Sequence, residues 1–134
     1  MNKKVALIGM FFILGAVLVF HFLIFTEQIP YDKVWAGKLN SVEEMKAFEA
    51  FSILINVFMM VVLFIKYHQV KRGKRNKVVD AFIWIFVGFF ALNTFGNLFA
   101  KSMIELIFGT LLTLISSILC FVIAKKEQTK EQSV

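Results

Sequence analysis

The sequence predicts an all-α membrane protein, a four-transmembrane-helix bundle with both termini in the cytoplasm. Hydrophobic residues make up 59% of the 134 residues, which is more than a water-soluble domain of this size can cover. A helix crosses the roughly 30 Å hydrocarbon core of a bilayer with about 20 apolar residues, and four stretches meet that length. They are residues 5–25, 47–65, 78–100 and 103–124.

The first stretch follows Met-Asn-Lys-Lys, an arrangement that also opens secretory signal peptides. Its apolar run continues to Phe25, and Thr26-Glu27-Gln28 offers no cleavage site of small residues. We therefore expect an uncleaved first transmembrane helix.

The second helix is expected to begin before its apolar stretch. Ser41 is followed three residues later by Glu44, a capping box in which the hydroxyl accepts the backbone N–H of the glutamate. This pattern predicts a helix from about Val42 to Lys66, which is roughly 37 Å at 1.5 Å per residue.

The third and fourth stretches are separated by Ala100-Lys101-Ser102 alone. So short a connection predicts a tight antiparallel hairpin of helices 3 and 4. Residues 125–134 form a short polar tail, and residues 1–134 form a single membrane domain.

Basic residues are distributed unequally between the two sides of the predicted bundle. Four face one side, and they are Lys33, Lys38, Lys46 and Lys101. Eleven face the other side, and they are Lys3, Lys4, Lys66, Lys71, Arg72, Lys74, Arg75, Lys77, Lys125, Lys126 and Lys130. The positive-inside rule places the richer side in the cytoplasm, so we expect a multi-pass protein of the cell (inner) membrane. This topology explains the basic loop without a nucleic-acid partner.

Seven polar or ionisable side chains within the stretches are candidate ligand-binding residues. A rise of 1.5 Å per residue puts them all in the outer half of the bundle, with the ionisable His21 and Glu49 at the rim. The full set is His21, Glu49, Ser52, Asn56, Asn93, Asn97 and Glu105.

Two interpretations of this set remain open. Asn and Ser side chains hydrogen-bond between packed membrane helices, each contributing on the order of 0.6 kcal/mol. In the first interpretation the set only holds the helices together. Polar and ionisable groups inside membrane spans also mark ligand sites, and Asn supplies both donors and acceptors. The second interpretation is a pocket, open to the outside, for a lipid headgroup or a small polar ligand.

Known catalytic and metal-binding signatures are missing from the sequence. A single Cys excludes an internal disulfide, and His21 and His68 are predicted on opposite sides of the membrane, where they cannot share a zinc ion. The motifs HExxH, GxSxG, CxxC and the P-loop are absent. We therefore assign no catalytic residue, metal or cofactor.

Three function classes follow. The first is a non-enzymatic binder of a lipid or small polar ligand, or an accessory subunit. The alternatives are a small transporter or channel acting as an oligomer, and a lipid-modifying enzyme of the outer leaflet that uses a carboxylate as base. The expected partners are membrane lipids, a second copy of the chain or a larger membrane complex.

Overall fold

The computed structural model describes residues 2–30, 40–100 and 102–125. In these residues the chain forms α1 (Lys3–Phe25), α2 (Val42–Lys71), α3 (Lys77–Asn97) and α4 (Thr110–Ala124). A π-helical turn, η3 (Glu105–Gly109), runs directly into α4. With η3 and α4 taken as one helix, all four helices are long and apolar enough to span a membrane. The described residues contain no strand, so the predicted all-α class is confirmed.

Polar side chains cap the first turns of three helices. The Ser41 hydroxyl accepts the Glu44 N–H at 3.0 Å, which confirms that α2 begins at Val42. Asn2 accepts from the N–H of Lys4 at the start of α1, and Asn76 caps α3 in the same way. Each cap satisfies backbone N–H groups that have no partner inside the helix.

The predicted end of α2 at Lys66 is wrong, because the helix continues to Lys71. No helix breaker occurs before Gly73, which adopts φ +67°. The Lys74 N–H donates to the carbonyl of Gln69 at 2.8 Å, so the helix ends in a Schellman motif. Its 30 residues span about 45 Å, well beyond the hydrocarbon thickness.

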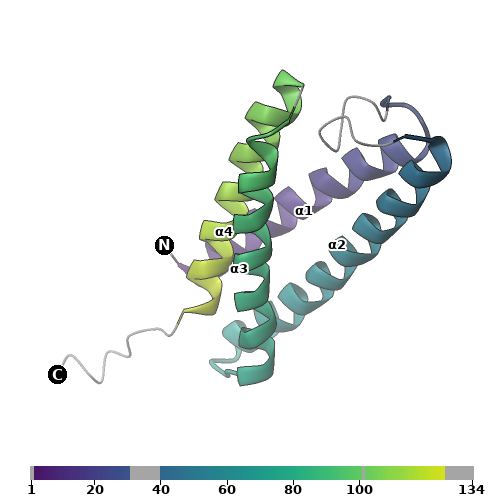
Figure 1. Ribbon diagram of the computed structural model, residues 1–134. Coiled ribbons are helices and arrows are strands. Elements are labelled where there is room, and N and C mark those ends of the chain that lie inside the picture. The colour runs from purple at the N-terminus through teal and green to yellow at the C-terminus, as the bar shows by residue number, and fades with distance from the viewer. Residues whose placement is uncertain (1, 31–39, 101, 126–134) are drawn as a thin grey trace.

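The helices form two pairs, each with its members side by side in Figure 1: α1 with α2, and α3 with η3 and α4. We call the end where α1 and α3 begin and α2 and α4 end the basic end. The opposite end is the distal end. Figure 1 shows the two pairs crossing near the basic end and separating toward the distal end.

Burial follows the same division. The main apolar core lies in the half of the bundle next to the basic end, and none of the described residues between 91 and 115 is buried. A second cluster, Ile24 with Met45, joins only α1 to α2. The two pairs are therefore packed against each other through one half of their length. The larger buried side chains of the main core are Leu7, Met10, Leu14, Met59, Leu63, Ile83, Phe86, Phe90, Leu119 and Ile123.

Candidate functional site

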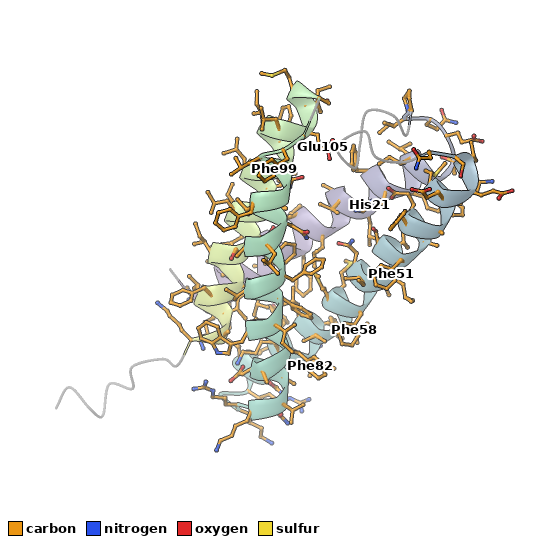
Figure 2. The ribbon with its side chains drawn as sticks, viewed as in Figure 1. His21, Phe51, Phe58, Phe82, Phe99 and Glu105 are labelled. Atoms are coloured by element: carbon orange, nitrogen blue, oxygen red, sulfur yellow. The ribbon has the colours of Figure 1, made fainter. Side chains whose placement is uncertain are left out.

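The seven candidate residues divide between the two helix pairs. The α1–α2 pair carries His21, Glu49, Ser52 and Asn56, and the α3–α4 pair carries Asn93, Asn97 and Glu105. Figure 2 labels His21 on the first pair and Glu105 at the distal end of the second. The His21–Glu49 and Asn56–Ser52 contacts lie within the first pair, and the Asn97–Thr113 contact lies within the second.

His21 and Glu49 form an ion pair between α1 and α2. The His21 Nδ1 lies 2.5 Å from the Glu49 Oε2. A carboxylate is an acceptor only, so Nδ1–H donates. Glu49, which we expected at the rim, is 0% exposed. Burying a carboxylate is costly unless it is paired, so this contact fixes α1 against α2 near the distal end.

Asn56 and Ser52 meet within α2 itself. The Asn56 Nδ2 donates to the backbone carbonyl of Ser52 at 2.8 Å, and Asn56 is only 8% exposed. This bond connects successive turns of one helix, so it does not hold two helices together.

Asn97 takes part in a polar contact between α3 and α4. Its Nδ2 lies 3.4 Å from the Thr113 hydroxyl, and the Thr94 hydroxyl lies 3.0 Å from the same oxygen. Gly109 permits this approach, because a Cβ there would stand 3.0 Å from the Asn97 Cγ. Thr94 was not among the candidate residues, although its position next to Asn93 was an available signal.

Asn93 and Glu105 are half-buried. The Asn93 amide makes no hydrogen bond to any described residue, although it lies on the outer half of a membrane-length helix. Glu105 begins the π-helical turn, and its N–H donates to the Ser102 hydroxyl at 3.4 Å.

A second ionic cluster, at the basic end, was not anticipated. The Lys66 Nζ lies 2.6 Å from one Asp80 carboxylate oxygen, and the Arg75 Nε lies 2.5 Å from the other. Lys66 is 1% exposed and Asp80 3%. From the sequence, Lys66 and Arg75 were used only to predict the orientation in the membrane. One clue to their pairing was overlooked: Asp80 is the one acidic residue between residues 50 and 104.

The same end holds a tie between α1 and α4. The Lys3 Nζ donates to the backbone carbonyl of Lys125 at 2.5 Å, where a helix C-terminus leaves carbonyls without partners. Two polar contacts that join the helix pairs, Lys66–Asp80 and Lys3–Lys125, therefore lie at the basic end.

The described residues contain no group of three His, Cys, Asp or Glu side chains placed to hold a metal ion. The His21–Glu49 pair orients an imidazole as an acid–base dyad would. Such a dyad could activate a thiol nucleophile, but the chain's one thiol, Cys120, lies buried in the core at the other half of the bundle.

Comparison of the chain with protein-family models, with curated proteins and with solved structures gives no match.

Proposed function

We propose that this chain is a non-enzymatic membrane protein that binds a lipid headgroup, or a small polar ligand of similar chemistry, at the distal end between its two helix pairs. Both termini lie in the cytoplasm of the cell (inner) membrane, the distal end faces outward, and α3 and α4 form a tight antiparallel hairpin. The orientation rests on nine of the ten basic residues that the structure describes falling at the basic end.

One observation carries this proposal: the outer half of α3 carries amide groups that the bundle covers only in part. Asn93 and Asn97 lie one turn apart, and no described residue from 91 to 115 is buried. An amide left in hydrocarbon without a hydrogen bond costs several kcal/mol. A bound headgroup would supply both the donor and the acceptor that Asn93 lacks.

The location also favours binding over transport. Below Asn56 and Asn93 the space between the pairs is filled by apolar side chains, including Met10, Met59 and Phe90. Phe58 on α2 packs edge-to-face on Phe82 of α3 with ring centres 5.5 Å apart. A polar ligand entering from the distal end thus meets a closed apolar floor halfway across.

The test is native mass spectrometry of the protein extracted from native membranes in mild detergent. We expect a retained lipid or small molecule, and we expect Asn93→Leu to lower its occupancy about tenfold, which corresponds to about 1.4 kcal/mol of lost binding energy. Because the Asn93 amide bonds to no described residue, this substitution leaves the bundle intact.

Phe95→Leu is the matched control. It introduces the same residue two positions away on the same helix, at a side chain that is already 66% exposed. Equal retention in both variants would contradict the proposal. A ligand-free protein that purifies only within a larger complex would point instead to an accessory subunit.

A further inference from the structure

A hollow of about 260 Å³ lies beside the last turns of α2 at the basic end. Two of its lining residues, Phe64 and Ile65, are exposed and apolar, whereas the other four are polar or basic. Those four are His68, Gln69, Arg72 and Lys74. The wall of the hollow is almost entirely apolar, and we call the two basic residues beside it, Arg72 and Lys74, its rim.

The depth of this hollow matches the boundary between hydrocarbon and headgroups. Lys66 follows Glu49 by 17 residues on one helix, a rise of about 25 Å, so these two ionic contacts mark the two edges of a core of about 30 Å. Phe64 and Ile65 then lie at acyl-chain level. Arg72 lies about 9 Å beyond Lys66, at the level of lipid phosphates.

The charges at the rim are available to a ligand. Asp80 is occupied by Lys66 and Arg75. Arg72 and Lys74 form no ion pair with any carboxylate of the described residues, and both are exposed. An anion is therefore the complementary group for this rim.

The backbone holds the rim in place. Gly73 in the left-handed conformation turns the chain so that the Lys74 N–H bonds to the Gln69 carbonyl at 2.8 Å. Arg75, the next residue, is anchored on Asp80. Arg72 and Lys74 are thus presented from an ordered turn, which lowers the entropy lost on binding.

We infer that this hollow binds an anionic glycerophospholipid. The lipid phosphate contacts Arg72, which can bind two of its oxygens at once, and Lys74. An acyl chain lies on Phe64 and Ile65. This site is separate from the distal site and uses none of its residues.

The test titrates the full-length protein in detergent with phosphatidylglycerol or phosphatidylcholine of identical acyl chains and reads occupancy by native mass spectrometry. We expect phosphatidylglycerol to bind about 30-fold more tightly, as two basic contacts at a membrane surface provide. The double variant Arg72→Gln/Lys74→Gln should abolish this preference. Asn93→Leu should leave it unchanged, which separates this site from the distal one.

The control is Lys4→Gln/Lys71→Gln, which removes two exposed basic residues from the same end without touching the hollow. If the control loses the preference as completely as the test variant, attraction is a general surface effect and the inference fails. It also fails if soluble glycerol phosphate at millimolar concentration displaces the lipid, because the site would then recognise the anion without its acyl chain.

Discussion

Two buried acids, Glu49 and Asp80, are each joined to a base on another helix or loop. Glu49 and Lys66 lie toward opposite ends of α2, so that helix is the common member of both contacts. Losing one partner of a buried pair leaves an uncompensated charge, which costs about 3–5 kcal/mol. We therefore expect substitutions at Glu49, Asp80 or their partners to lower the free energy of unfolding more than substitutions at exposed residues do.

Lys66→Met tests this effect at the residue scale. The substitution leaves Asp80 buried with Arg75 alone, so we expect the free energy of unfolding to fall by about 3 kcal/mol. Unfolding in mixed detergent, followed by circular dichroism, measures it.

The exposed Lys71→Met is the control for Lys66→Met, and it should change stability by no more than about 0.5 kcal/mol. Replacing both partners, as Lys66→Met/Asp80→Leu, should recover much of the loss, since an apolar pair leaves no buried charge. Equal losses in Lys66→Met and Lys71→Met would show that the ion pair contributes nothing.

At the scale of the elements, α1 and α2 end in the same motif with different residues. Gly73 occupies the left-handed position after α2, where its φ is +67°. After α1 that position is taken by Glu27 with φ 65°, and its N–H and that of Gln28 bond to the last carbonyls of the helix. A side chain bearing a Cβ is strained in this conformation.

Glu27→Gly is therefore expected to raise the free energy of unfolding by about 1 kcal/mol. Glu27→Gln removes the charge but keeps the Cβ, so it should leave stability unchanged. Thermal unfolding of the two variants in one detergent compares them. An equal gain in both would assign the effect to the charge of the exposed carboxylate.

On the scale of the whole molecule, the two helix pairs share one apolar core, and the Lys66–Asp80 and Lys3–Lys125 contacts tie them together at the basic end. Toward the distal end they separate (Figure 1), and the His21–Glu49 contact lies within one pair. A ligand between the pairs would be accommodated there without disturbing the core.

The proposed orientation predicts which side each end of the bundle faces. Glu27→Cys and Lys71→Cys, each in a Cys120→Ala background, place one thiol at each end. A membrane-impermeant maleimide should label the first in intact cells and the second only after permeabilisation, because the basic end stays in the cytoplasm. The reverse pattern would contradict the orientation.

The sequence alone determined the four apolar helices and the start of α2, because both depend on residues close together in the chain. Hydrophobic length decides whether a segment suits a bilayer, and the Ser41 cap involves groups three residues apart. The end of α2 also depends on nearby residues, but the prediction overlooked Gly73.

Only the tertiary structure decided that Lys66 pairs with Asp80, that Glu49 is enclosed with His21, and that the seven candidate residues divide between two helix pairs. Glu49 and Asn56 lie seven residues apart on one face of α2, and both are buried. A shared face does not tell which distant side chain it meets. Helix rotation and crossing are set by side-chain packing between distant segments, and the polar partners follow from that packing.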